Sequence, residues 1–218
     1  LRETIVNCLV EADRQKVKSI AIPSISSGIF GVPKPLCAQM YTEGVVKFSK
    51  TYSFQFIKEI HFVDMVSEMC QLTQLAFDTK LNHPGKNIPE TSVGSNMDNL
   101  SADQKQLHGN KENSYVFKPL DHLSILIYSH DITDICVDAI ICPVSPYREG
   151  AIVKSLKQTC GSLYTDVIYT GVMTLIKNEN DVVFRSHGKE NLHFKHILHI
   201  YSPHWARAED ADYDREFE

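Results

Sequence analysis

The sequence predicts an α/β fold, and its alternating pattern of strands and helices carries this prediction. Apolar strand patterns at residues 20–22 and 57–63 are separated and flanked by helical patterns at 5–16, 36–48 and 67–80. A similar pattern restarts near residue 123, with apolar runs at 125–127 and 137–142, helical spacing at 152–156 and further strand patterns at 182–184 and 195–201. Strands that alternate with helices are typical of a mostly parallel sheet covered by helices.

Composition narrows the function classes. The 218 residues are 43% hydrophobic and 22% charged, as expected for a globular chain with a sizeable core. The net charge of -5 speaks against a nucleic-acid surface, which needs a basic face, so we expect no direct nucleic-acid binding. No apolar run approaches the roughly 20 residues of a membrane span, and we expect no membrane partner.

The six cysteines are scattered and show no C-x-x-C spacing. Most lie inside apolar patterns, which favours buried reduced thiols over a disulfide framework. Residues 1–9 have a helical pattern with charged side chains and do not look like a signal peptide. We therefore expect a nuclear or cytoplasmic location, and the missing initiator Met suggests a fragment of a longer protein.

Residues 81–120 interrupt the alternating pattern. They are rich in Asn, Gly, Ser, Lys and Gln and lack periodic apolar residues, which is typical of a flexible linker. So long a loop is unusual inside one domain, and it suggests a boundary between a unit at 1–80 and a unit at 121–208. The acidic residues 209–218 read as a frayed tail.

The run SIAIPSISSGIFGVPKP at residues 19–35 is the strongest candidate for a binding loop. An apolar strand leads into a loop of small residues, and a helix follows that is opened by Pro33 or Pro35. Gly28 and Gly31 can take positive φ, so that successive backbone N–H groups point into one concavity beside a helix N-terminus. The sequence therefore predicts a phosphate cradle, and the alternative is an ordinary strand-to-helix turn.

This loop resembles the second ligand loop of macrodomains, the ADP-ribose-binding α/β modules. Residues 1–80 resemble the C-terminal half of a macrodomain, and residues from 123 onward resemble the N-terminal half of a next one, as in the tandem macrodomains of ADP-ribosyltransferases. The resemblance implies a three-layer αβα fold with a mixed, mostly parallel central sheet. It also implies ADP-ribose, or proteins that carry mono- or poly-ADP-ribose, as ligand and partner, and no cofactor.

The resemblance implies specific ligand contacts. In LSILIYSHDIT, Asp131 would accept a hydrogen bond from the adenine amino group and Ile132 would frame the base. Asp131 could equally cap the short helical turn that follows it, and both roles are compatible. In the other loop, backbone amides would hold the diphosphate and an aromatic side chain would contact sugar or base. The candidate ligand residues of this loop, which follows the strand at 20–22, are Ser26, Ser27, Gly28, Ile29, Phe30 and Gly31.

The first ligand loop of the second unit departs from the family. Macrodomains usually carry Asn-Ala-Ala-Asn and a glycine run there, whereas this chain has Cys-Pro-Val-Ser at 142–145 and the single glycine Gly150. Ser145 stands where an Asn would contact the distal ribose, and one glycine brings less backbone to the diphosphate. Ser145 and Gly150 are candidate ligand contacts, Arg148 could pair with a phosphate oxygen, and removal of ADP-ribose by hydrolysis is disfavoured.

We assign no catalytic residue and no metal ligand. His193, His196, His199 and His204 suggest a metal site, but a strand at 195–201 would direct neighbouring positions to opposite faces. The serines at 26–27 lack a Gly-x-Ser-x-Gly pattern. This chain is therefore expected not to be an enzyme itself, although its parent protein could be an ADP-ribosyltransferase.

The two incomplete units are complementary. They could pair as a circular permutant, with strands near residues 20, 57, 137 and 197 in one sheet and the two ligand elements at one cleft. The leading function is recognition of ADP-ribose within a larger multi-macrodomain protein. The alternatives are an ADP-ribosyl hydrolase, a fragment of an ADP-ribosyltransferase whose catalytic domain lies elsewhere, and an interaction scaffold without ligand.

Overall fold

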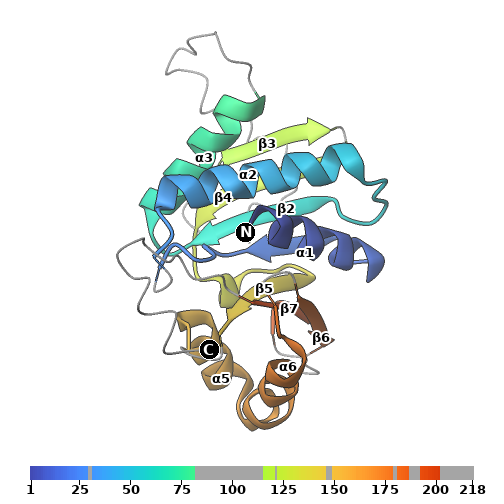
Figure 1. Cartoon of the computed structure of the whole chain (residues 1–218), viewed down its shortest axis with the longest axis vertical. Helices are drawn as coiled ribbons and strands as arrows, with labels where there is room; N and C mark the ends of the chain where they lie inside the picture. The colour runs from blue at the N-terminus through green and yellow to red at the C-terminus, as the bar shows by residue number, and fades with distance from the viewer. Residues whose placement is uncertain are drawn as a thin grey trace.

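The computed structural model describes residues 1–28, 31–81, 115–120, 122–145, 149–178, 181–186 and 192–201. One sheet of seven strands forms its centre, in the order β3-β4-β2-β1-β5-β7-β6. The helices α1, α2 and α3 pack on one side of it, and α5 and α6 lie beside the strands β5, β7 and β6 (Figure 1). The predicted α/β fold with a mixed central sheet is confirmed.

The first part of the chain supplies the two middle strands. Helix α1 (Arg2–Arg14) leads to β1 (Ser19–Ile22), α2 (Lys34–Thr51) leads to β2 (Glu59–Asp64), and α3 (Ser67–Leu81) follows. Pro33 is the N-cap of α2 and Pro35 lies in its first turn, as the sequence predicts. Strands β1 and β2 pair in parallel.

The last part supplies both flanks of the sheet. It comprises β3 (Tyr115–Leu120), β4 (Leu123–Ser129), the 3-10 turn η4 (Ile132–Asp134), β5 (Ala139–Val144) and α5 (Ala151–Cys160). The π-helical turn η5 (Leu163–Tyr169), α6 (Thr170–Leu175), β6 (Val182–Ser186) and β7 (His196–Tyr201) complete it. The pairs β2–β4, β1–β5 and β5–β7 are parallel, and the edge strands β3 and β6 are antiparallel to their neighbours.

Strand β3 corrects the sequence analysis, which placed no strand in residues 81–120. The tripeptide Tyr-Val-Phe starts this strand against β4, and the register shifts between Phe117 and Leu120. The proline at 119 fits an edge strand, because one side of such a strand needs no ladder hydrogen bonds. Residue 81 is the last residue of α3, and residues 82–114 and the predicted tail 209–218 lie outside the described residues.

The core has two parts, one on each face of the sheet. Alternation along β1 places Ile20 and Ile22 toward α1, α2 and α3, while Ala21 faces the other cluster. Strands from both ends of the chain contribute to each cluster. The single sheet is therefore the arrangement that the permutant hypothesis required, whereas the division into two half-domains at residues 80 and 121 stays a prediction.

Candidate functional site

A pocket of about 240 Å³ opens where three parallel strands end. Pro23 follows β1, Asp64 ends β2, and His130 follows β4, so the pocket lies at the carboxyl edge of the sheet. Open α/β sheets bind ligands at this edge. Its lining comes from both parts of the chain: Pro23, Ser24, Val63, Asp64, Met65, His130, Asp131, Ile132, Thr133, Ala151, Ile152 and Ser155.

Asp131 divides its carboxylate between two roles. Its Oδ1 atom accepts hydrogen bonds from the backbone N–H and the hydroxyl of Thr133, each at 2.8 Å, which caps the turn η4. Its Oδ2 atom accepts no hydrogen bond from any residue in the described ranges. The predicted cap is confirmed, and one carboxylate oxygen stays available to a donor in the pocket.

Asp64 places a second carboxylate at the pocket. Its Oδ1 accepts a hydrogen bond from the Val66 N–H at 2.6 Å, and its carbonyl oxygen accepts from the Ser129 hydroxyl at 2.9 Å and from the His130 N–H at 3.2 Å. The two bonds to the Asp64 carbonyl join the end of β2 to the end of β4. Two carboxylates favour a ligand group that carries hydrogen-bond donors and disfavour an anion at this end of the cleft.

Apolar side chains complete the pocket walls. Ile132 is buried, and Met65 is 75% exposed at the rim, in the turn after β2. Val63 and Ile152 also contribute surface. An apolar lining with a few fixed polar groups is typical of a site for a flat organic ring. The volume is below the roughly 300–1,000 Å³ of pockets that enclose a whole small ligand, so this pocket fits part of a nucleotide.

The small-residue loop after β1 is folded tightly on itself. Ser26 takes a φ of 65° and Gly31 a φ of 72°, whereas Gly28 does not take positive φ, contrary to the prediction. The Gly31 N–H donates to the Gly28 carbonyl at 3.0 Å, and the Val32 N–H donates to the Ser26 carbonyl at 2.9 Å. The Gly31 amide is therefore occupied within the loop. A serine held in the left-handed region is uncommon and is typical of a functional turn.

Tyr41 of α2 holds the loop after β1 in place through two hydrogen bonds to Ile25. Its buried hydroxyl donates to the Ile25 carbonyl at 2.6 Å and accepts from the Ile25 N–H at 2.7 Å. Burial raises the pKa of this phenol well above its usual value, so the hydroxyl stays protonated. Sequence reasoning missed this contact, because a tyrosine on the apolar face of a helix looks like an ordinary core residue.

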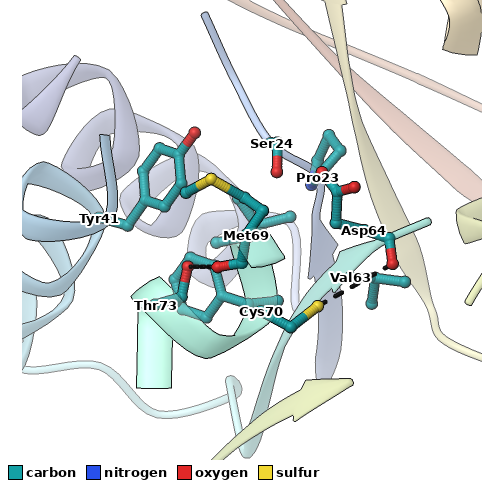
Figure 2. Close-up of a pocket in the computed structure, with 10 residues that line it drawn as sticks. Pro23, Ser24, Tyr41, Val63, Asp64, Met69, Cys70 and Thr73 are labelled. Carbon is teal, nitrogen blue, oxygen red and sulfur yellow. Dashed lines mark hydrogen bonds between the residues drawn. The ribbon is translucent and has the colours of Figure 1, made fainter. Parts of the chain in front are cut away.

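A smaller cavity of about 10 Å³ lies beside the main pocket (Figure 2). It shares Pro23, Ser24, Val63 and Asp64 with the main pocket, and Tyr41 and Cys70 also line it. The Cys70 thiol donates to the Asp64 carbonyl at 3.9 Å, and burial raises its pKa to about 11. This volume is about the space that one water molecule needs, so the cavity is a small gap between the loop after β1 and helix α3.

The loop after β5 contributes through the helix that follows it. Gly150 is the N-cap of α5, and Ala151, Ile152 and Ser155 of this helix line the pocket. Ser145 is buried at the end of β5 and is not among the lining residues. Arg148 lies outside the described residues, as do Ile29 and Phe30 of the other loop.

Of the predicted ligand residues, Asp131 and Ile132 line the pocket. Ser26, Ser27, Gly28 and Gly31 belong to the loop that begins beside it at Ser24, and their role as ligand contacts stays a prediction. The sequence analysis missed Ser24 and Asp64. Asp64 could have been found, because it is a carboxylate at the carboxyl end of a predicted parallel strand.

One group of reactive side chains away from the pocket, Cys142, Tyr164 and His199, is buried. The Tyr164 hydroxyl lies 3.1 Å from His199 Nε2 and 3.6 Å from Cys142 Sγ. Burial raises the pKa of Cys142 to about 12, so this thiol is not a thiolate nucleophile at neutral pH. In the described ranges, no three His, Cys, Asp or Glu side chains gather to hold a metal ion, and His204 lies outside them.

A family model and solved structures that match this chain are both described as macrodomains. Residues 1–41 match the family model described as Macro domain. The Oryza sativa APL macrodomain, solved in complex with ADP-ribose, superposes with a TM-score of 0.55 and 13% identity over 91% of this chain and 87% of that one. A Dictyostelium discoideum ADP-ribose binding macrodomain superposes with a TM-score of 0.50 and 9% identity over 90% and 84% of the two chains.

The resemblance to the macrodomain family is confirmed. Human protein mono-ADP-ribosyltransferase PARP14 is 25% identical over an alignment of 215 positions that covers 94% of this chain and 11% of that protein. The O-acetyl-ADP-ribose deacetylase of Salmonella newport is 32% identical over 72 residues, 33% of this chain and 39% of that enzyme. The chain thus spans about a tenth of PARP14. Among the described residues of this macrodomain fold, no helix is long and apolar enough to cross a membrane.

Proposed function

We propose that this chain binds ADP-ribose, free or attached to a protein, in the pocket at the carboxyl edge of its sheet. The observation that carries the proposal is the Oδ2 atom of Asp131, which accepts no hydrogen bond from the described residues, beside the apolar surface of Ile132. An adenine ring offers an exocyclic amine, which is a donor, on an otherwise flat apolar body. The known macrodomains that share the fold are described as ADP-ribose binders or as complexes with it.

The charges of the pocket assign an orientation to the ligand. With Asp64 and Asp131 at one end, a diphosphate is repelled from that end and the base is favoured. Ser24, which also lines the pocket, begins the loop whose Ser27 and Gly28 amides are the remaining candidates for the diphosphate. The distal ribose would then point toward Ser145 at the end of β5 and Gly150 at the start of α5.

Support for a larger parent protein comes from the match to PARP14, which spans almost the whole of this chain. We propose that the chain is part of a multi-macrodomain protein and acts there as a reader of ADP-ribosylation rather than as its enzyme. All six cysteines are free thiols, and five of them are buried. This supports a reducing compartment, the nucleus or the cytoplasm, as its location.

Calorimetric titration of ADP-ribose into the wild-type chain and into Asp131→Asn tests the proposal. Asparagine is a good N-cap, so η4 keeps its cap while the free oxygen that accepts from adenine is lost. We expect saturable 1:1 binding that weakens about 10- to 100-fold in the variant, the range for a charge-assisted hydrogen bond. As matched control, Asp181→Ala removes a carboxylate that accepts from the Lys177 and Asn178 amides away from the pocket, and it should leave affinity unchanged.

The ligand side provides the complementary test. Inosine diphosphate ribose carries a carbonyl oxygen in place of the adenine amine, so wild type should discriminate against it. The Asp131→Asn variant should lose this preference, because the carboxylate that reads the amine is gone. If wild type binds both ligands equally, Asp131 does not face the base and the proposed orientation is wrong.

A further inference from the structure

The two halves of the chain are interleaved within one sheet. Residues 1–81, here the N-segment, supply β1 and β2, and residues 115–201, here the C-segment, supply β3 and β4 on one side and β5, β7 and β6 on the other. Both edges of the N-segment strand pair are therefore covered by the C-segment. Alone, the N-segment would present two open sheet edges, each with unpaired backbone N–H and C=O groups.

Backbone pairing between the segments is extensive on one side. Strands β2 and β4 are in register over six residue pairs, from Glu59 with Ser124 to Asp64 with Ser129. The Ser124 N–H also donates to the Lys58 carbonyl at 2.8 Å, just before the ladder begins. At the other edge, β1 meets β5 over two residue pairs, Ile20 with Ala139 and Ala21 with Ile140.

A polar latch reinforces the shorter of the two junctions. Asp138 Oδ2 accepts hydrogen bonds from the N–H groups of Lys18 at 2.8 Å and Ser19 at 3.3 Å. In return, the Ser19 hydroxyl accepts from the Asp138 N–H at 2.8 Å. These three bonds join N-segment to C-segment at the start of the paired strands, and the acceptor is ionised, which strengthens two of them.

The apolar core also crosses between the segments. Helix α1 of the N-segment packs against β6 and β7 of the C-segment, and α3 packs against β4. The core beneath these helices combines buried N-segment residues such as Ile5 and Leu9 with C-segment residues such as Leu198 and Ile200. Burial of this kind is the dominant favourable contribution to association.

From this interleaving we propose that the N-segment and the C-segment hold together without residues 82–114, so that either segment can take its counterpart from a second copy of the chain. The contacts between the segments are the same whether one chain or two supply them. The covalent connection then adds only a local concentration of one segment around the other. Exchange of segments between copies is the expected consequence when the connection does not restrain them.

Cutting the connection tests the proposal. A site for a specific protease is inserted between Gly94 and Ser95, or in a second variant between Gly109 and Asn110, and the purified chain is cleaved after folding. We expect the cleaved chain to elute at the volume of the uncleaved one, with both segments in the peak and an unchanged circular dichroism spectrum. Separate elution or precipitation of the segments, in both variants, would overturn the proposal. Neither result depends on ADP-ribose binding, so the proposed function can fail while this inference holds.

Exchange is measured with labelled copies. An unlabelled chain with an affinity tag at its N-terminus and an untagged ¹⁵N-labelled chain are cleaved, mixed in equal amounts, unfolded in urea and refolded by dilution. The tag should then recover labelled and unlabelled C-segment in equal amounts. Recovery of no C-segment at all, or of none that carries the label, would contradict exchange between copies.

The latch gives a matched pair of variants. In the cleaved chain, Asp138→Ala should raise the dissociation constant between the segments about tenfold or more, because two charge-assisted bonds across the junction are lost. Asp181→Ala removes a carboxylate with two amide donors inside the C-segment and should leave this constant unchanged. Equal effects of the two variants would show that the latch does not join the segments.

Discussion

Asp131 serves the fold and the proposed ligand through different oxygen atoms. The Oδ1 atom is committed to Thr133, while Oδ2 faces no donor among the described residues. The sequence could indicate both roles, because an Asp before a short turn is a cap and the Asp-Ile-Thr pattern resembles a macrodomain motif. It could not indicate Tyr41, whose contact with Ile25 depends on how α2 packs under the loop.

We expect Tyr41→Phe to destabilise the fold by about 1–3 kcal/mol, because the buried N–H and carbonyl of Ile25 both lose their partner. The loop that begins near the pocket would loosen, so ADP-ribose should also bind more weakly. Urea denaturation measures the first effect and calorimetry the second. Tyr52→Phe is the control, because the Tyr52 side chain is 41% exposed. Equal stability of the two variants would contradict the role of Tyr41.

Burial of His199 makes the free energy of unfolding depend on pH. Burial lowers its pKa from 6.5 to about 3, so the folded chain keeps this imidazole neutral. Between these two values the unfolded chain binds a proton that the folded chain does not, and stability falls as the pH falls below about 6.5. The loss from this group approaches 1.4 kcal/mol per pH unit. Denaturation between pH 7 and pH 4 should show a shallower decline for His199→Gln, and an identical decline would disprove the assignment.

At the level of elements, hydrophobic patterns located the six predicted strands within about two residues of their observed bounds, whereas three of the four predicted helices differ by three or four residues at one end. The π-helical turn η5 was missed because its interior pattern has no simple period, and β3 because a polar, proline-containing stretch looked like a linker. Both are decided by tertiary contacts. Strand β3 forms against β4, and Tyr164 of η5 is fully buried beside His199.

The packing of α1 on α2 depends on Gly44. A Cβ atom at this position would lie 2.8 Å from the Ile5 side chain, so Gly44→Ala forces the helices apart and should cost about 1–3 kcal/mol. Gly171 in α6 has open space around it, and Gly171→Ala should instead stabilise by up to about 1 kcal/mol. Thermal unfolding of both variants gives the comparison. A Gly44→Ala variant as stable as wild type would contradict the close approach of the two helices.

For the whole molecule, the sequence indicated complementary halves but could not decide whether they pair. That decision rests on long-range contacts, such as Asp138 with Lys18 and β2 with β4, which no local pattern encodes. The single sheet also explains how the pocket arises. Ser24 and Asp64 come from the N-segment, and Asp131 and Ile132 come from the C-segment, so neither segment contains the site by itself.

Titration of ADP-ribose into the ¹⁵N-labelled chain, followed by NMR, is the most direct test of one shared cleft. The amide signals of Ser24 and Asp64 in the N-segment and of Asp131 and Ile132 in the C-segment should all shift. They should follow the same dissociation constant, because one ligand touches both walls. Shifts confined to one segment, or two different constants, would contradict a single cleft built from both ends of the chain.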